Sequence, residues 1–367
     1  MQKIHSVLVL GLGKVGTLVA WLLHESGFQV LAVDRRLREE FPFAARALDV
    51  GSPEALADLL QGADAVVSCL PYSANLGVAA LAHQRGVHYF DLTEDVPTTR
   101  AIIEMSRSAT AVMAPQCGLA PGFIAIAGAS LAARFERIRS IKLRVGALPR
   151  HPTGLLAYAF NWSPEGVVNE YLNDCEVIEN GQHKWVSPLE WLERLVIDGT
   201  QLEAFTTSGG LGTMCETFAG KVENLDYKSI RYPGHAKLMN FFFHELLLRE
   251  DRGKAGEILV HAKPPVNDDL VYLHASVEGW QQGSLAREEF VRAYYPEEIA
   301  GRRWRAIAWT TAASVCAVIE LVSAGTLPDR GFLKQEQIAL DAFLQTRNGR
   351  LYAGQPHGGM ACPAGAG

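Results

Sequence analysis

The sequence lacks the cysteine spacing of a zinc site or a disulfide framework. Its six cysteines are scattered over 367 residues, with no C-x-x-C pair and no Cys/His cluster at zinc-ligand spacing. We therefore expect no metal site. Reduced, mostly buried thiols are the simplest interpretation, because a free cysteine packs as a small apolar side chain.

The sequence also lacks an excess of basic residues and a long apolar run. Lys and Arg number 34 against 40 Asp and Glu, a net charge of −6, which argues against nucleic acid as the main partner. No uninterrupted apolar run reaches the ~18 residues that span a bilayer, so we expect no integral membrane protein. The first ten residues show no small-residue cleavage site; we interpret them as mature sequence and expect a cytoplasmic location.

The first third of the chain alternates short β-type runs with helical patterns. This alternation predicts βαβ units and a doubly wound parallel sheet that ends near residue 122. The expected strands are 6–10, 29–33, 65–69, 88–91 and 111–114, with a further short strand closed by residues 49–50. The expected helices are 16–25, 53–60, 75–85 and 97–109.

From about residue 138 the pattern changes to alternating strands, such as 140–145 and 270–277, with long connections. This pattern predicts a second, α+β domain on a mixed or antiparallel sheet. A long apolar helix over 303–324, with no obvious strand after it, is expected to pack back on the first domain. The predicted division is 1–122 plus about 303–350 for the first domain, 123–302 for the second, and a disordered Gly/Ala/Pro-rich tail at 353–367.

A G-x-G-x-x-G pattern follows the first expected strand and opens the first expected helix. In dinucleotide-binding folds these glycines allow a tight turn, close approach of a pyrophosphate, and close packing of helix on strand. The pattern also occurs in ordinary turns, but its place in a βαβ unit favours a Rossmann-type dinucleotide site. The predicted contacts are Gly11, Gly13, Lys14, Val15 and Gly16.

The second expected strand leads to Asp34, 18 residues after the glycine motif, where a ribose-binding acid belongs. A carboxylate there accepts from the ribose 2′-OH and repels a 2′-phosphate, which favours NAD. Arg35 and Arg36 have the geometry to bind such a phosphate, so NADP stays an alternative. Asp49 and Val50 are expected to contact the adenine, although a plain loop is the other interpretation.

Two polar loops follow later strands at their carboxyl ends, the edge where doubly wound sheets bind ligands. The first loop holds Leu70, Pro71 and Tyr72, and the second runs from Asp91 to Asp95. Either loop alone is consistent with surface turns. Because both lie at one sheet edge, we expect Leu70, Pro71 and Asp91 to contact the cofactor and Tyr72 the substrate.

Three further motifs occur in order: G-A-L-P at 146–149, F-N-W-S-P-E-G-V-V at 160–168 and I-R-Y-P-G-H at 230–235. Behind a dinucleotide fold, they resemble the saccharopine dehydrogenase family over about residues 5–325. The resemblance implies an NAD(P)-dependent oxidoreductase that acts on a C–N bond of an amino acid.

One departure from the family pattern concerns the substrate. Saccharopine reductases typically carry G-L-D-P-G-I-D-H at the end of the nucleotide domain, whereas this chain has G-L-A-P-G-F-I-A over 118–125 and lacks both carboxylates. The A-P-G version and the complete P-G-H turn look more like lysine 6-dehydrogenases, which convert the ε-amine of lysine to a semialdehyde and ammonia. Lysine 6-dehydrogenase is the first hypothesis, and saccharopine dehydrogenase is the alternative.

Amine oxidation of this kind needs a proton acceptor and an anion-binding group. His235 lies in the Pro-Gly turn and is the expected catalytic base, with helix capping as the alternative. Arg231 has the fork geometry to bind a substrate carboxylate, or else forms a structural salt bridge.

Four other side chains complete the predicted site. Glu94 and Asp95 are expected to bind an ammonium group or assist as bases, and an N-cap role is the alternative for one of them. Trp162 and Ser163 are expected to shape the substrate pocket, although Trp162 fits ordinary core packing equally well.

Two hypotheses of another class stay open, a nicotinamide-sensing protein without chemistry and a scaffold subunit with a structural nucleotide. A sensor would not need the Arg231 and His235 pair. The sheet-rich second domain is expected to supply the interface of a homodimer or higher homo-oligomer.

Overall fold

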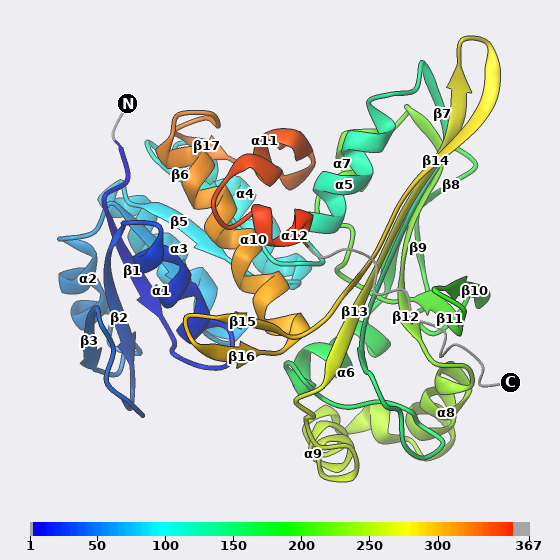
Figure 1. Ribbon diagram of the computed structural model, residues 1–367, viewed down its shortest axis with the longest axis horizontal. Coiled ribbons are helices and arrows are strands. Elements are labelled where there is room, and N and C mark those ends of the chain that lie inside the picture. Colours follow the sequence, from blue (N-terminus) through cyan, green and yellow to red (C-terminus); the bar gives the residue numbers. More distant parts are fainter. Residues whose placement is uncertain (1–2, 355–367) are drawn as a thin grey trace, which may run out of the picture.

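The computed structural model describes residues 3–354 and contains two large sheets (Figure 1). A parallel sheet is built mainly from the N-terminal third, and a mixed sheet from the middle of the chain. The predicted disordered tail falls almost wholly on residues 355–367, which lie outside the described residues.

The first sheet confirms the predicted doubly wound fold. Its strand order is β3-β2-β1-β4-β5-β6-β17, and every neighbouring pair is parallel. The order reverses between β1 and β4, which makes their carboxyl ends the ligand-binding edge. The strands are β1 (Ser6–Leu10), β2 (Gln29–Asp34), β3 (Ala44–Ala47), β4 (Ala65–Ser68), β5 (His88–Asp91), β6 (Val112–Ala114) and β17 (Gly331–Phe332).

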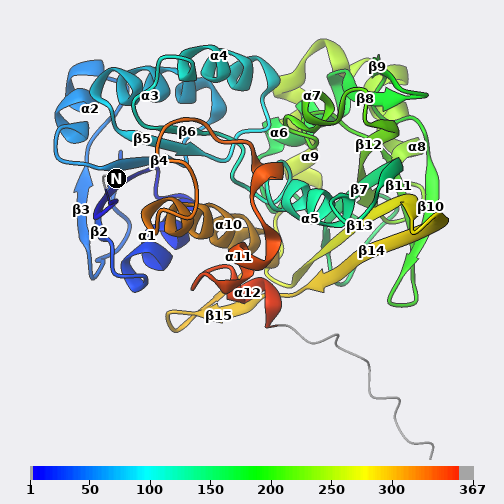
Figure 2. The same cartoon turned by 90° about the horizontal axis from the view of Figure 1, so that it is seen from above.

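Alternate residues of β1 pack against helices on opposite faces of this sheet. Val7 and Val9 join the cluster that contains α1 and α10, whereas Leu8 and Leu10 pack with α2 and α3. Figure 2 shows these helices on opposite sides of the strands. Burial on both faces explains the nearly continuous apolar runs of the strands. The helices are α1 (Gly16–Glu25), α2 (Pro53–Leu60), α3 (Tyr72–Arg85), α4 (Val96–Ser106) and α10 (Ala306–Ser323).

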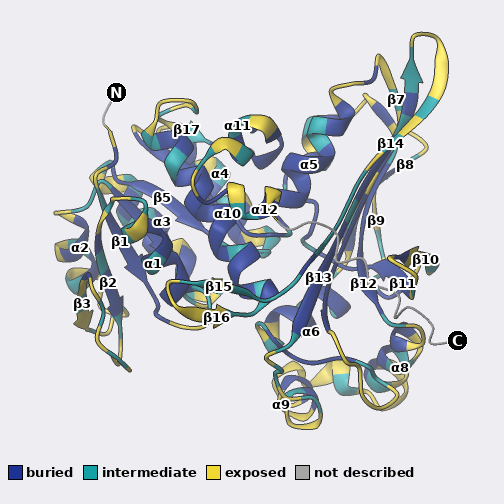
Figure 3. Cartoon of the chain, in the orientation of Figure 1, coloured by how far each residue is buried: buried dark blue, intermediate teal, exposed yellow. Residues whose placement is uncertain are grey.

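Helix α10 is long and apolar enough to cross a membrane by length and composition, with a mean hydropathy of 1.6, but 78% of it is buried inside the protein. Figure 3 shows it in the colour of buried residues. It is therefore accounted for as a core helix. It begins at Ala306, later than expected, because residues 302–304 form β16 (Arg302–Trp304), which pairs with β15 (Glu297–Ile299).

The expectation of no strand after this helix is wrong. Strand β17 follows α10 and pairs in parallel with β6, which brings the chain back into the first sheet. It consists of only Gly331 and Phe332, too short for a periodic pattern to be read. After it come a 3₁₀ turn (Gln335–Gln337), α11 (Leu340–Gln345) and α12 (Arg350–Ala353).

The second sheet is mixed, as the sequence predicts. The order β10-β11-β12-β7-β13-β14 contains one parallel pair, β7 with β12, while β8 pairs with β12 and β9 off this path. Its strands are β7 (Arg137–Pro149), β8 (Cys175–Glu179), β9 (Gln182–Val186), β10 (Glu193–Ile197), β11 (Thr200–Thr206), β12 (Val222–Arg231), β13 (Asp269–Gln281) and β14 (Ser284–Tyr294). Its helices are α5 (Phe123–Ala132), α6 (Pro164–Leu172), α7 (Met214–Phe218), α8 (His235–Asn240), a π-helical turn (Phe241–Glu245), a 3₁₀ turn (Leu248–Glu250) and α9 (Arg252–Ala262).

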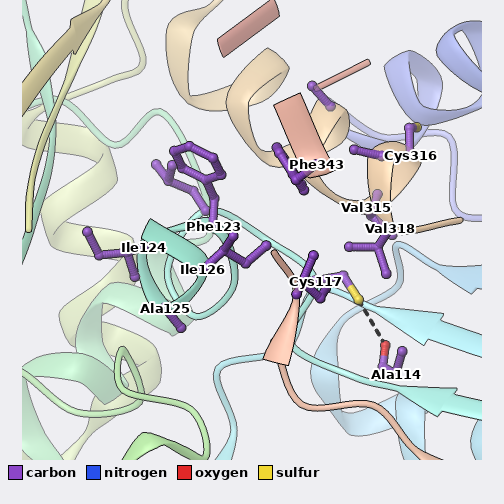
Figure 4. Packing of buried hydrophobic residues seen from close by; sticks show 14 of the residues in the cluster. Ala114, Cys117, Phe123, Ile124, Ala125, Ile126, Val315, Cys316, Val318 and Phe343 are labelled. Atoms are coloured by element: carbon purple, nitrogen blue, oxygen red, sulfur yellow. Dashed lines mark hydrogen bonds between the residues drawn. The ribbon is translucent and has the colours of Figure 1, made fainter. Parts of the chain in front are cut away.

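Helix α5 joins the cores of the two sheets. Phe123 stacks on Tyr352 with ring centroids 3.9 Å apart and packs against Phe343 at 5.2 Å. Figure 4 shows Phe123 and Phe343 in this cluster, near Cys117, whose thiol donates to the Ala114 carbonyl. One hydrophobic cluster thus includes residues of both sheets, which fixes the first sheet's ligand-binding edge relative to the second domain.

Candidate active site

A cavity of about 730 Å³ lies where the ligand-binding edge of the first sheet meets the second domain. Its wall combines the glycine loop, the loops after β4 and β5, helix α6, and the ends of β7 and β12. Leu70, Pro71 and Tyr72 line it, as expected for that loop. Tyr72 opens α3, which begins earlier than predicted, after Pro71 at the N-cap position.

The glycine loop has the geometry that a pyrophosphate requires. Gly11 has φ +89°, and a Cβ there would lie 2.9 Å from the Cys69 carbonyl oxygen. A Cβ at Gly16 would overlap the Gly11 carbonyl oxygen. Gly13 has no atom within 4 Å of its Cβ position and lines the cavity, so its backbone is open to a ligand. The three glycines thus meet three separate steric demands, and the loop fits a dinucleotide.

Two cations flank this loop. Lys14 lines the cavity together with Val15, and burial followed by the nearby Arg305 charge lowers the pKa of Lys14. Arg305 is held by hydrogen bonds from Nε to the Val266 carbonyl (2.6 Å) and from Nη2 to Asn267 (2.9 Å). The sequence offers no motif that would have identified Arg305. The pair places positive charge where phosphates would bind.

Asp34 is fixed at the end of β2. Its Oδ2 accepts the Leu12 backbone N–H at 2.6 Å and its Oδ1 accepts that of Arg36 at 3.2 Å. The first bond ties the carboxylate to the glycine loop. Arg35 and Arg36 are both exposed.

Asp49 and Val50 do not line the cavity, and the strand expected to end there stops at Ala47. Asp49 accepts the Gly51 N–H at 3.0 Å within a turn that precedes α2. The plain-loop interpretation therefore describes these two residues better than an adenine contact.

Asp91 braces two loops from inside the protein. It is fully buried; Oδ1 accepts N–H groups from Thr93 (2.9 Å) and Gln116 (3.1 Å), and Oδ2 accepts the Tyr89 hydroxyl (2.6 Å). Burial raises its pKa to about 6, against the effect of these bonds. Asp91 is absent from the cavity wall, which corrects the expected cofactor contact: its carboxylate is fully used in holding the loops.

Glu94 lines the cavity and is tightly enclosed. A Cβ at Gly166 would lie 2.7 Å from its Oε1, and a Cβ at Gly209 would lie 2.7 Å from its carbonyl oxygen. Burial raises the pKa of Glu94 to about 7, and the charge of Asp95 adds to this effect. A carboxyl group that titrates near neutrality suits proton transfer.

Asp95 is the N-cap of α4, the alternative role considered for Glu94 or Asp95. Its Oδ2 accepts from the Thr98 backbone N–H at 2.9 Å and from the Thr98 hydroxyl at 2.6 Å, and it is not in the cavity wall. Ser163 caps α6 by accepting the Gly166 N–H at 3.1 Å, and it also lines the cavity beside Trp162.

Arg231 reaches the cavity from the end of β12. It is 3% exposed; its Nε donates to the Tyr171 hydroxyl (2.8 Å) and its Nη1 to the Ile230 carbonyl (2.8 Å). The face of Tyr158 lies 4.8 Å from the guanidinium carbon. Arg231 is thus rigidly held with part of its fork directed at the cavity.

His235 is not in the cavity wall, which corrects its predicted role as catalytic base. Its Nδ1 lies 3.0 Å from the Leu156 carbonyl, which only accepts, so Nδ1 donates and Nε2 accepts from the Tyr171 hydroxyl at 3.0 Å. Burial and the nearby Arg231 charge lower the pKa of His235 to about 3. The neutral ring therefore orients Tyr171, which in turn orients Arg231.

Sequence reasoning missed Glu170, on α6. This side chain is 6% exposed and lines the cavity. Burial raises its pKa to about 8, Arg231 opposes the rise and Glu94 adds to it. One feature of the sequence could have identified Glu170. In the segment V-V-N-E-Y, this carboxylate lies among apolar residues on the buried face of a helix, where a charged side chain is unusual.

One group of side chains in residues 3–354 has metal-ligating types close together: Glu176, His183 and Cys215 offer ligand atoms within 4.8 Å of one another. His183 Nε2 and Glu176 Oε1 are 2.7 Å apart. None of the three lines the cavity.

Comparison with known proteins gives matches over nearly the whole chain. Residues 7–116 match the family model described as saccharopine dehydrogenase NADP binding domain, and residues 118–348 match the saccharopine dehydrogenase C-terminal domain. A curated relative, the mitochondrial alpha-aminoadipic semialdehyde synthase of Mus musculus, is 24% identical over 266 residues, which is 66% of this chain and 28% of that protein. The chain thus spans less than a third of that relative's length.

Two solved structures share the fold. Apo saccharopine dehydrogenase (L-Glu forming) from Saccharomyces cerevisiae superposes with a TM-score of 0.73 at 17% identity, covering 93% of this chain and 96% of that one. C. glutamicum DAP dehydrogenase in complex with DAP gives a TM-score of 0.52 at 12% identity, covering 97% and 100%.

Proposed function

The chain belongs to the saccharopine dehydrogenase family. We propose that it is an NAD(P)-dependent dehydrogenase acting on C–N bonds and that it oxidises the ε-amine of lysine with NAD. The products are 2-aminoadipate 6-semialdehyde and ammonia. The reaction takes place in the 730 Å³ cavity between the two sheets.

The charge of the cavity wall is the observation that carries the choice of lysine. Apart from the cations Lys14, Arg303 and Arg305, the charged residues of the wall are Arg231, Glu94 and Glu170 with buried carboxyl groups, and the exposed Glu165. Ala120 lines the wall at the turn where saccharopine reductases carry an aspartate. Lysine brings one carboxylate and two amines, whereas saccharopine brings three carboxylates. One guanidinium and two carboxyl groups match the charges of lysine.

NAD is the preferred cofactor in this proposal. The glycine loop holds the pyrophosphate and Asp34 binds the ribose hydroxyls. Asp34 is held at the end of β2 by the Leu12 N–H at 2.6 Å. Asp34 lies outside the wall of the cavity, so its proposed role rests on the position of an acid after the glycine motif. The exposed Arg35 and Arg36 are free to move toward solvent.

When bound, NAD supplies the hydride acceptor, so that the amine-bearing carbon becomes an imine that water hydrolyses to aldehyde and ammonia. The carbon that bears the ε-amine gives up hydride readily only when that amine is neutral, so Glu94 would take a proton from the ε-ammonium group before that step. Arg231 holds the substrate carboxylate, and the neutral His235 acts only by positioning Tyr171 and, through it, Arg231. Trp162 supplies an apolar wall.

The test compares kcat/KM for lysine, saccharopine, ornithine and other diamino acids at a fixed NAD concentration. The rate of each reaction is measured as the formation of NADH. We expect lysine to give the highest ratio, because kcat/KM measures discrimination between competing substrates. Efficient turnover of saccharopine with no NADH from lysine would overturn the proposal. Binding of NAD without turnover of any substrate would favour the sensor hypothesis.

A further inference from the structure

Glu170 lines the cavity and carries an unpaired carboxyl oxygen. Within residues 3–354 its Oε2 has no hydrogen-bond partner, although it is buried. The nearest cation is Arg231, whose Nη2 lies 3.9 Å away, beyond hydrogen-bond distance. A buried carboxyl oxygen without a hydrogen bond is costly, so this one is better explained by a ligand than by the fold alone.

The opposing Arg231 is held in place from behind. Nε donates to Tyr171, which donates to His235, which donates to the Leu156 carbonyl, so a relay of three hydrogen bonds fixes the guanidinium plane. No hydrogen bond of Nη2 is found among the described residues. Arg231 and Glu170 therefore lie next to each other at the same cavity wall, and Arg231 Nη2 and Glu170 Oε2 have no hydrogen bond to any described residue.

We propose that Arg231 and Glu170 together form a binding site for the α-carboxylate and α-ammonium groups of an amino acid. Two protein groups 3.9 Å apart contact neighbouring groups of one ligand, and in an α-amino acid the carboxylate and the ammonium are attached to the same carbon. Arg231 binds the carboxylate through Nη2, and Glu170 accepts from the ammonium, whose charge favours the ionised form of this carboxyl group. The inference rests on the proposed function for the cavity's use of amino-acid substrates.

This assignment gives each of the two nitrogens of the substrate one buried carboxyl group of the protein. Glu170 holds the α-ammonium, which does not react, and Glu94 is left for the amine that is oxidised. Glu165 also lines the cavity, but it is exposed and therefore screened by water. The site thus selects substrates whose reacting amine is distinct from the α-amine.

Binding without turnover tests the assignment. The protein saturated with NADH is titrated calorimetrically with L-lysine, with 6-aminohexanoate, which lacks the α-amine, and with L-norleucine, which lacks the ε-amine. We expect the intact protein to bind lysine about tenfold or more tighter than 6-aminohexanoate, since a charged hydrogen bond contributes roughly 1.5–3 kcal/mol. In Glu170→Gln this ratio should fall to near one, while Glu165→Gln should keep it.

The outcomes separate this inference from the proposed function. An unchanged ratio in Glu170→Gln overturns the inference, as does equal binding of lysine and 6-aminohexanoate by the intact protein. Because 6-aminohexanoate does not use Glu170, its unchanged affinity in Glu170→Gln shows that the variant is folded. If norleucine and lysine bind through Glu170 but lysine never gives NADH, the result would support this site and refute the proposed reaction.

Discussion

At the residue scale, Arg231 and His235 belong to one turn but have different roles. Arg231 reaches the cavity, whereas His235 lies outside its wall and is connected to Arg231 by hydrogen bonds through Tyr171. The sequence motif places both residues in one turn but does not say which faces the ligand. That choice depends on how the end of β12 and the start of α8 pack, which only the tertiary structure determines.

The cofactor preference can be tested at Asp34. Asp34→Ser removes the charge that opposes a 2′-phosphate while keeping a hydroxyl that can hydrogen-bond. We expect the dissociation constant for NADPH, divided by that for NADH, to fall by about tenfold, because a charged hydrogen bond contributes roughly 1.5–3 kcal/mol. Fluorescence titration with both cofactors measures it. If the unsubstituted protein already binds NADPH tenfold more tightly than NADH, Arg35 and Arg36 govern the pocket and the assignment is wrong.

Glu94 should control the pH dependence of turnover. Its pKa of about 7 is raised by burial, so the carboxylate that accepts a proton forms as pH rises through 7, and kcat/KM should rise with it. Glu94→Gln cannot accept a proton, and we expect kcat/KM to fall about 100-fold or more, with the rise near pH 7 lost. Initial rates from pH 5.5 to 9 measure both effects. If Glu94→Gln retains the rise of kcat/KM near pH 7, another residue is the base.

The sequence predicted some site residues and missed others for physical reasons. The glycine motif could be read because each glycine meets a local steric demand that recurs with fixed spacing. Glu94 was predicted from its loop at the sheet edge. Glu170 was missed because a single glutamate on a helix is ordinary in sequence, and only the packing of α6 against β12 buries it beside Arg231.

At the scale of elements, α4 depends on the capping bond from Asp95. Asp95→Ala removes the acceptor of the Thr98 N–H and should lower the free energy of unfolding by about 1 kcal/mol, whereas Asp95→Asn keeps an acceptor and should change it little. Denaturant unfolding measures the difference. If Asp95→Asn weakens substrate binding while unfolding is unchanged, the charge of Asp95 contacts substrate after all.

Elements with strong periodicity were predicted well, and those defined by distant contacts were not. Helix 16–25 and helix 53–60 match α1 and α2. The start of α10 was misplaced because its cap comes from Asp269 on β13, whose carboxylate accepts N–H groups from Ala306 (2.7 Å) and Ile307 (3.1 Å). A cap from another element leaves no signal in the local sequence.

At the scale of the whole molecule, the shared core around α5 and α10 holds the first sheet's ligand-binding edge against the second domain. The cavity therefore exists only because both parts of the chain contribute walls to it, the glycine loop and Glu94 from the first sheet and Arg231 and Glu170 from the second domain. Fold class followed from strand and helix alternation. The meeting of these particular residues did not, since it depends on a junction between regions that are distant in sequence.

The origin of the transferred hydride tests the central claim most directly. The protein is incubated with NAD and L-lysine carrying deuterium either at both C6 positions or at C2, and the reduced cofactor is analysed by mass spectrometry. Oxidation of the ε-amine predicts one deuterium per NADH from the C6-labelled substrate and none from the C2-labelled one. Deuterium that arrives from C2, or a cofactor reduced only when saccharopine replaces lysine, would contradict the account.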